Sequence, residues 1–308
     1  MVLKHSSPAP GSTSRLVRRV PPSVRRALNP VRDSVRAGLV SASARMGRIG
    51  PVPDYLVIGA QRSGTTWLQR LLVTHPDIVA PRTKEVHYFD QHWHLGLRWY
   101  QANFTPAANV ARRRPGPRRE VRTGEATPYT LFHPLGPSRV ASTVPDAQLV
   151  VVLRDPVQRA WSHWRHARHL GVEAETFARA VELEEHRLHG ADELLRTYPS
   201  ARHGSHQHHS YLARGRYALQ LESWYEHVLR NRLLIVWFDD LVRLPGDSIA
   251  RVLDHIDARP FAADPTIAPP SNRTAPLDPA LAAELRSRFD DDDRALGDLL
   301  GAVPPWRR

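Results

Sequence analysis

The 308-residue sequence contains no cysteine, which excludes disulfide bonds and thiolate metal ligands, and with them a secreted disulfide scaffold. It contains no run of about 18 apolar residues, so no membrane-spanning helix is expected. The N-terminus lacks the continuous apolar stretch of a secretory signal, and we therefore expect a cytoplasmic location. Lysine is scarce too: only Lys4 and Lys84 occur among the 43 basic residues, a composition typical of a GC-rich, bacterial coding bias.

The net charge of +12 is concentrated at one end of the chain. Residues 1–50 hold ten basic residues against the single acid Asp33, so the rest of the chain carries only +3. Their Ser, Pro and Arg content predicts a largely disordered basic tail, with a short amphipathic helix around Val31–Met46. This tail is solvated, contacts a membrane surface or polyanion, or is a transit peptide. The folded part is not expected to bind nucleic acid.

Residues 51–308 are predicted to form one domain. Apolar runs at Tyr55–Ile58, Gln148–Leu153 and Leu233–Phe238 predict buried strands, each followed by a helical pattern. Alternating strands and helices predict an α/β, P-loop-like three-layer fold, with a central parallel sheet flanked by helices. Further helical patterns occur at about residues 173–189, 211–230 and 279–289.

The stretch YLVIGAQRSGTTWLQRLL, residues 55–72, combines a strand, a glycine-rich turn and the start of a helix. Four residues separate Gly59 from Gly64, as in a Walker A motif, but Thr65 stands where that motif has Lys. The cation lies inside the turn, at Arg62. Because backbone N–H groups of such a turn bind anions, and a guanidinium suits phosphate or sulfate oxygens, this segment predicts an anion site.

A second cation, Arg154, follows the strand Gln148–Leu153 and precedes Asp155 and Pro156, where a helix is expected to begin. A cation at the end of a buried strand predicts a second anion there. One alternative is a P-loop kinase using ATP and Mg²⁺ with Asp155 as a metal ligand, which the missing Walker Lys and Arg154 disfavour. The other alternative is a non-catalytic nucleotide-binding protein.

Three motifs, at residues 61–67, 84–90 and 154–164, resemble in their order and spacing those of sulfotransferases that use 3′-phosphoadenosine 5′-phosphosulfate (PAPS) as donor. QRSGTTW (61–67) resembles their 5′-phosphosulfate loop, usually written with Lys where Arg62 stands, and RDPVQRAWSHW (154–164) their 3′-phosphate motif. KEVHYFD (84–90) resembles the corresponding segment of heparan sulfate sulfotransferases. The resemblance extends over about 53–306 through GEATPYTLF (124–132), GRYALQLESWYEHV (215–228) and PPW (304–306).

The resemblance implies a set of donor-binding residues. Arg62 would contact the 5′-phosphate and the sulfuryl oxygens, Trp67 would stack on adenine unless it is a core residue, and Arg154 with Ser162 would hold the 3′-phosphate. The remaining donor-binding residues are Ser63, Gly64, Thr65 and Thr66 in the loop, with Tyr217 and Arg273 as further adenine or phosphate contacts.

The resemblance also implies catalytic residues. Glu85 would be the base that takes a proton from an acceptor hydroxyl or amine. By their position beside it, Lys84 either assists Arg62 at the sulfuryl group or is a solvated lysine, and His87 is a weaker base candidate. No metal is expected, and the histidine-rich run at 202–210 predicts a mobile, solvated loop because its spacing does not suit metal ligation. The expected acceptor is a carbohydrate or glycosylated small molecule.

Overall fold

The computed structural model describes residues 35–106, 121–264, 266–269 and 276–308. In these ranges the core is a five-stranded sheet of order β2-β3-β1-β4-β5, with every neighbouring pair parallel. The strands are β1 (Tyr55–Gly59), β2 (Ile78–Val79), β3 (Arg122–Ala126), β4 (Gln148–Leu153) and β5 (Leu233–Trp237). The prediction of an α/β fold around a central parallel sheet is confirmed, although the sequence analysis did not identify β2 and β3.

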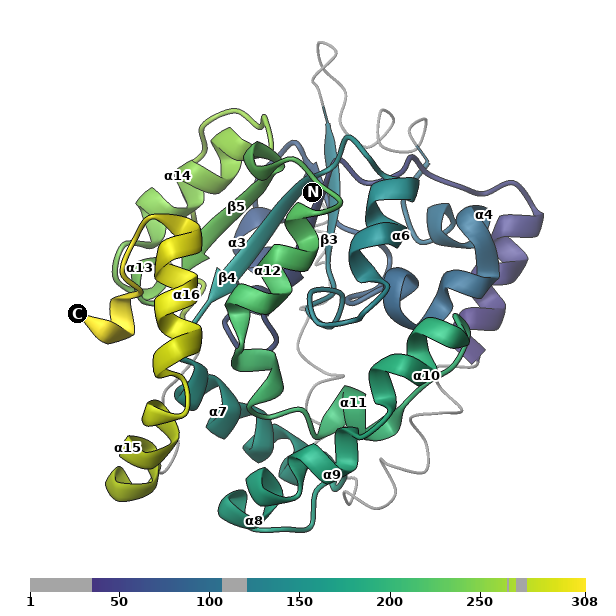
Figure 1. Cartoon of the computed structure of the whole chain (residues 1–308). Helices are drawn as coiled ribbons and strands as arrows, with labels where there is room; N and C mark the ends of the chain where they lie inside the picture. The colour runs from purple at the N-terminus through teal and green to yellow at the C-terminus, as the bar shows by residue number, and fades with distance from the viewer. Residues whose placement is uncertain (1–34, 107–120, 265, 270–275) are drawn as a thin grey trace, which may run out of the picture.

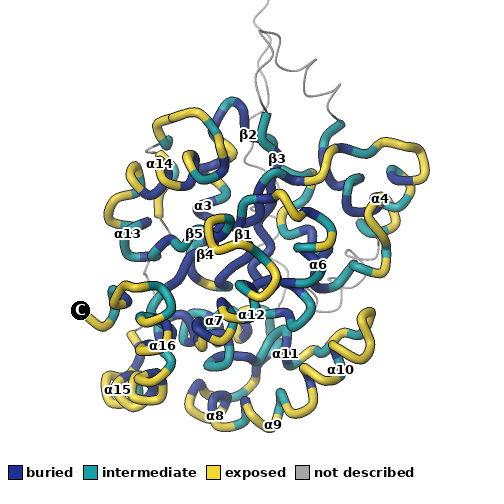
Figure 2. The backbone as a smooth tube through the Cα atoms, turned by 45° about the horizontal axis from the view of Figure 1, so that its top comes forward, coloured by how far each residue is buried: buried dark blue, intermediate teal, exposed yellow. Residues whose placement is uncertain are grey.

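Strands β1 and β4 are mainly apolar because helices cover both faces of the sheet (Figure 2). On β4, Leu149 and Val151 pack into one core cluster, whereas Val150 packs into the other. The first cluster includes residues of α6 (Gly136–Thr143), α12 (Tyr217–Tyr225) and α16 (Asp290–Leu300). The second includes residues of α3 (Thr65–Leu72), α13 (Phe238–Arg243) and α14 (Pro245–His255). The fold therefore has the three predicted layers.

The remaining helices extend the domain beyond the sheet, and α7 to α11 lie together below it in the view of Figure 1. They are α4 (Gly96–Gln101), α7 (Pro156–Leu170), α8 (Phe177–Glu182), α9 (Glu184–Leu188), α10 (Ala191–Thr197), α11 (Gly204–His208) and α15 (Pro279–Ser287). Short helices are η1 (Tyr88–His92), η2 (Trp93–Leu95), η3 (Ala213–Gly215), η4 (Arg230–Arg232) and η5 (Pro305–Arg307).

Two helix predictions need correction. The helix expected at 173–189 is two short helices, α8 and α9, on either side of Leu183. The helix expected at 211–230 is the short η3 followed by α12, of which only Tyr217–Tyr225 is α-helical. The acidic run Asp290–Asp293 forms the first turn of α16, where carboxylates suit the positive end of the helix dipole. Arg307 pairs with the buried Asp293 and so ties the C-terminal η5 to α16.

The strand order changes direction at β1, which lies between β3 and β4. Loops that leave the carboxyl ends of β1 and β4 therefore diverge and leave room for a ligand between them. The first loop becomes α3, and the second becomes α7 through Asp155 and Pro156. Asp155 Oδ1 accepts the backbone N–H groups of Val157 and Gln158 at 2.8 and 3.2 Å, which confirms the predicted N-cap. The carboxylate is thus used by the helix, and the magnesium-ligand alternative gains no support.

The N-terminal part differs from the expected boundary at residue 50. Residues 35–45 form a helix beside α4 (Figure 1), and Val40 and Ala44, one turn apart, are buried in the first core cluster. Trp99 Nε1 donates to the Ala37 carbonyl at 3.2 Å. A helix is therefore present within the expected range Val31–Met46, but it packs against the folded domain. The basic tail is predicted for residues 1–50, and residues 1–34 of it lie outside the described residues. No helix in the described ranges is long and apolar enough to cross a membrane.

Candidate active site

A cleft of about 410 Å³ opens at the carboxyl ends of β1 and β4. Residues that the sequence analysis selected from three distant segments line it together: Arg62, Gly64, Thr65, Thr66, Trp67, Lys84, Glu85, Arg154 and Ser162. The fold thus brings both predicted anion sites and the predicted base into one cavity.

The loop before α3 has the conformation expected of an anion-binding turn. Gly64 has φ +89°, and a Cβ there would lie 3.0 Å from Phe238 Cε2, so both backbone and space favour glycine. Arg62 also has a positive φ, of +71°. Trp67 is 5% exposed and donates from Nε1 to the Ile267 carbonyl at 3.0 Å, while its side chain lines the cleft. The two interpretations of Trp67 are therefore compatible.

The two predicted anion sites are continuous. Arg154 Nη1 donates to the Arg62 carbonyl at 3.2 Å, and Arg62 Nε donates to Ser162 Oγ at 3.2 Å. The Arg154 guanidinium lies 4.6 Å over the Phe238 ring, and its buried Nε has no hydrogen-bond partner among the described residues. A buried N–H without an acceptor is costly, and an anion beside Arg154 would satisfy it.

The predicted residues that do not line the cleft are also located. Ser63 is fully buried beneath the loop. Tyr217 is buried on α12, and its hydroxyl donates a hydrogen bond to the Arg154 carbonyl at 2.8 Å. It therefore supports the backbone directly after β4. Arg273 lies outside the described residues.

Two further arginines, missed in the sequence, reinforce the positive charge behind the loop. Arg214 Nη1 donates to Gln61 Oε1 at 2.5 Å, and the fully buried Arg159 donates to the Gln61 carbonyl at 3.5 Å. Burial lowers the pKa of the Arg159 guanidinium, and the charges of Arg154 and Arg62 add to this. Partial burial lowers the pKa of Arg62, and the charge of Arg154 again adds to the effect. This mutual repulsion favours a ligand with several negative charges.

The segment 84–90 carries the candidate base. Lys84 Nζ lies 3.1 Å from Glu85 Oε1, and His87 Nε2 lies 3.5 Å from Glu85 Oε2. His87 Nδ1 in turn lies 3.0 Å from Oδ1 of the buried Asp90. The three side chains Glu85, His87 and Asp90 thus form a chain from the cleft into the core, in which the imidazole joins two carboxylates.

The charges in this chain stabilise one another. Burial alone raises the pKa of the Glu85 carboxyl, but the hydrogen bond to His87 and the charges of Lys84 and His87 outweigh it and lower the pKa to about 2. Burial lowers the pKa of His87, but the charge and hydrogen bond of Asp90, with those of Glu85, raise it to about 10. Near neutral pH Glu85 is therefore an anion and His87 a cation.

The backbone of this segment is unusual. Glu85 and His87 have φ of +54° and +56°, a region that costs non-glycine residues on the order of 1 kcal/mol or more each. Glu125, buried on β3, accepts the Val86 N–H at 3.1 Å and the Tyr100 hydroxyl at 2.7 Å. The Tyr100 ring stacks on Tyr88 at 4.4 Å. The sheet therefore fixes the inner side of the segment.

The histidine-rich run is neither loop-like nor solvated, and that prediction was wrong. It contains α11, and His206 is 1% exposed with Nδ1 2.7 Å from the Tyr129 hydroxyl. His209 Nε2 lies 3.0 Å from the Val172 carbonyl. These histidines became buried because they find polar partners in distant segments, which spacing alone does not reveal. Among the described residues, no group of three His, Asp or Glu side chains is arranged to hold a metal ion.

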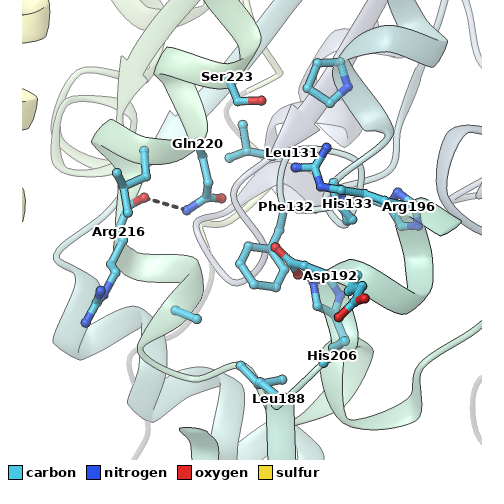
Figure 3. Close-up of a pocket in the computed structure, with 17 residues that line it drawn as sticks. Leu131, Phe132, His133, Leu188, Asp192, Arg196, His206, Arg216, Gln220 and Ser223 are labelled. Carbon is cyan, nitrogen blue, oxygen red and sulfur yellow. Dashed lines mark hydrogen bonds and ion pairs between the residues drawn. The ribbon is translucent and has the colours of Figure 1, made fainter.

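A second cavity, of about 420 Å³, lies between α10 and α12 (Figure 3). Asp192 and Arg196 border it from α10, Gln220 and Ser223 from α12, and Phe132 lies between them. None of the predicted donor-binding or catalytic residues lines it. The candidate active site is therefore the cleft at the strand ends.

Comparison with known proteins agrees with this geometry. Residues 52–263, about two thirds of the chain, match the family described as the sulfotransferase domain. The chain belongs to the sulfotransferase family. Its sulfotransferase domain is similar to that of a solved sulfotransferase from Alicyclobacillus acidocaldarius, with a TM-score of 0.62 and 26% identity over 84% of this chain and 100% of that chain.

The curated relatives of this sulfotransferase include heparan sulfate enzymes. It is 29% identical over 213 residues to mouse heparan sulfate glucosamine 3-O-sulfotransferase 3B1, covering 69% of this chain and 48% of the relative. It is also 29% identical over 212 residues to bifunctional heparan sulfate N-deacetylase/N-sulfotransferase 1 of Caenorhabditis elegans, covering 66% of this chain and 22% of the relative. The chain thus spans less than half the length of these relatives.

Proposed function

We propose that this protein transfers the sulfuryl group of PAPS to a hydroxyl or amine of a carbohydrate or glycosylated small molecule. The observation that carries the proposal is the single cleft in which Arg62, Arg154 and Ser162 stand beside Glu85. A polyanion site next to an ionised base suits transfer of an anionic group to a nucleophile that must lose a proton.

The residues at the strand ends fit both phosphate groups of the donor. Arg154, with its unpartnered Nε, and Ser162 would hold the 3′-phosphate, while the turn at 62–66 and the N-terminus of α3 would hold the 5′-phosphosulfate. Trp67 and Phe238 border the cleft and offer apolar surface to adenine. Arg62 would stabilise charge on the leaving phosphate, but a guanidinium keeps its proton, so Arg62 does not act as a general acid.

Glu85 would accept the proton of the attacking group. Its low pKa makes it a weak base without ligand, but donor anions beside Lys84 and Arg62 would oppose the charges that now stabilise the carboxylate. The pKa of Glu85 should therefore rise once the donor is bound. Lys84, 56% exposed at its side chain and 3.1 Å from Glu85, would move to the sulfuryl oxygens. His87, held as a cation by Asp90, would orient the base through its contact with Glu85.

The acceptor class is proposed from the names of the relatives, which act on heparan sulfate and its glucosamine. The residues that line the cleft include the cations Lys84, Arg62 and Arg70 and the aromatic Trp161. An aromatic face beside cations suits a sugar ring that bears acidic groups.

The direct test incubates the full chain with radiolabelled PAPS and an unsulfated heparan backbone, either N-acetylated or with free glucosamine amines. Labelled polysaccharide, formed by the wild type and not by Glu85→Gln, is the expected result, and the preferred polymer separates hydroxyl from amine transfer. Phosphorylation of either polymer from ATP and Mg²⁺ would overturn the proposal. Tight binding of adenosine 3′,5′-bisphosphate without transfer to any acceptor of a carbohydrate panel would instead favour a nucleotide-binding protein.

A further inference from the structure

The helix 35–45 touches the segment that carries the candidate base, although it precedes the part of the chain that matches the sulfotransferase family. Arg36 Nη2 lies 3.3 Å from the Lys84 carbonyl and 3.4 Å from the Glu85 carbonyl. These two carbonyls flank the Cα of Glu85, whose backbone is in the left-handed region.

The backbone groups of residues 84–87 are satisfied from two opposite sides. From the sheet, Glu125 accepts the N–H of Val86 at 3.1 Å, and Thr127 Oγ1 accepts the N–H of His87 at 3.5 Å. The carbonyls of Lys84 and Glu85 receive the guanidinium of Arg36 from the helix. A strained backbone persists only where its surroundings hold it, and here the holding groups come from β3 and from residues 35–45.

The helix itself is firmly attached. Val40 and Ala44 are each 8% exposed and belong to the same core cluster as Tyr88 and Trp99. Trp99 Nε1 and Arg98 Nη2 donate to carbonyls of the helix, at Ala37 and Ala44 respectively. Figure 1 shows this helix alongside α4. Arg36 therefore extends from a fixed support.

We propose that Arg36 is a positioning residue for the base: its guanidinium clamps the Lys84 and Glu85 carbonyls and so holds the Glu85 carboxylate at the cleft. This role rests on the proposed function of Glu85 and adds to it a residue outside the matched family region. Arg36 is not among the described residues that line the cleft. Its effect should appear in turnover and in the order of residues 84–88, with donor affinity unchanged.

The test compares the full-length wild type with Arg36→Ala, Arg36→Lys and Arg45→Ala. Arg45 is exposed on the same helix and serves as the matched control. In Arg36→Ala we expect the amides of Val86 and His87 to exchange with deuterium about tenfold faster, because the Lys84 and Glu85 carbonyls lose the guanidinium that holds this backbone against Glu125 and Thr127. Transfer from PAPS to the heparan backbone should fall about tenfold or more in kcat, since small misplacements of a catalytic group are costly.

The remaining readouts separate positioning from general loosening. The KM for PAPS and the exchange of the loop peptide 60–66 should stay within about twofold of wild type. Arg36→Lys should recover part of kcat, because an ammonium keeps the charge and can donate to the same carbonyls as Nη2, although its flexible stem holds them less rigidly than the planar guanidinium. Unchanged deuterium exchange at residues 84–88 in Arg36→Ala would overturn the inference. A fall in kcat in Arg45→Ala as large as that in Arg36→Ala would overturn it too. If the wild type transfers nothing, the proposed function fails, while the exchange experiment still decides whether Arg36 orders this segment.

Discussion

Arg154 offers the sharpest test of the two anion sites proposed for the cleft. Replacing it with alanine removes the guanidinium that lies over Phe238 and has an unpartnered Nε. The Arg154 guanidinium has five N–H donors. One of them, on Nη1, donates to the Arg62 carbonyl of the loop, so other donors remain for a ligand. If Arg154 holds the 3′-phosphate, the variant should bind adenosine 3′,5′-bisphosphate poorly and adenosine 5′-phosphate normally.

The size of the effect follows from the hydrogen bonds lost. A hydrogen bond involving a charged group contributes about 1.5–3 kcal/mol, so losing the Arg154 contact should cost about 2–3 kcal/mol. That corresponds to an increase of about 30- to 150-fold in the Kd of the bisphosphate. Isothermal titration calorimetry of both nucleotides against wild type, Arg154→Ala and Arg154→Lys measures it as a double-difference cycle.

Two outcomes would refute this reasoning. An equal loss of affinity for both nucleotides would mean that Arg154 acts on the 5′ side or only supports the loop through the Arg62 carbonyl. Unchanged affinity for the bisphosphate would mean that Arg154 does not contact the ligand. Arg154→Lys should fall between wild type and alanine, because the charge remains and the planar fork is lost.

Three further changes test the rest of the site. Glu85→Gln should lower turnover at least about 100-fold with the bisphosphate Kd unchanged within about twofold, and turnover above a tenth of wild type would contradict its role as base. Gly64→Ala should lower the melting temperature and weaken bisphosphate binding, because φ is +89° and Phe238 is 3.0 Å from the new Cβ, whereas Gly204→Ala, in open space, should do neither. His87 has its pKa raised from 6.5 to about 10, so its stabilising contribution is complete below pH 6.5 and is lost as pH rises through 10. The melting temperature of the wild type should therefore fall more between pH 7 and 10 than that of His87→Asn, and parallel curves would refute the ion-pair chain.

The sequence predicted the parts of the fold that depend on local pattern. Gln148–Leu153 is apolar without alternation because both faces of β4 are covered, and Asp155 with Pro156 begins α7 as a cap and first-turn pair do. By contrast, β3 reads RTGEA and contains the buried Glu125, whose burial depends on Tyr100, Thr127 and the Val86 N–H. Those partners come partly from other segments, so no window of sequence around Glu125 indicates a strand.

The same limit explains which site residues were missed. The turn at 62–66 and the RDP junction carry their candidate chemistry in consecutive residues, and Arg62 and Arg154 both line the cleft. Arg214 and Arg159 add charge behind the loop through Gln61, but they lie 153 and 98 residues away from it in the chain. Arginines on a helix usually indicate a solvated face, and only the fold shows that these two are buried.

The N-terminal helix shows where composition misleads. Arg36 is one of the ten basic residues in residues 1–50. This segment also lacks apolar runs, and its composition predicts disorder. Two kinds of contact show that residues 35–45 are ordered. Val40 and Ala44 belong to the same buried cluster as Trp99, and Trp99 Nε1 donates to the Ala37 carbonyl of this helix. Once the helix is fixed, Arg36 no longer contributes to a diffuse basic tail but places a guanidinium at the carbonyls on both sides of the Glu85 Cα. The effective boundary of the catalytic domain is therefore set by contacts with segment 84–104, and truncation at residue 50 should remove part of the support of the base while leaving the cleft residues in place.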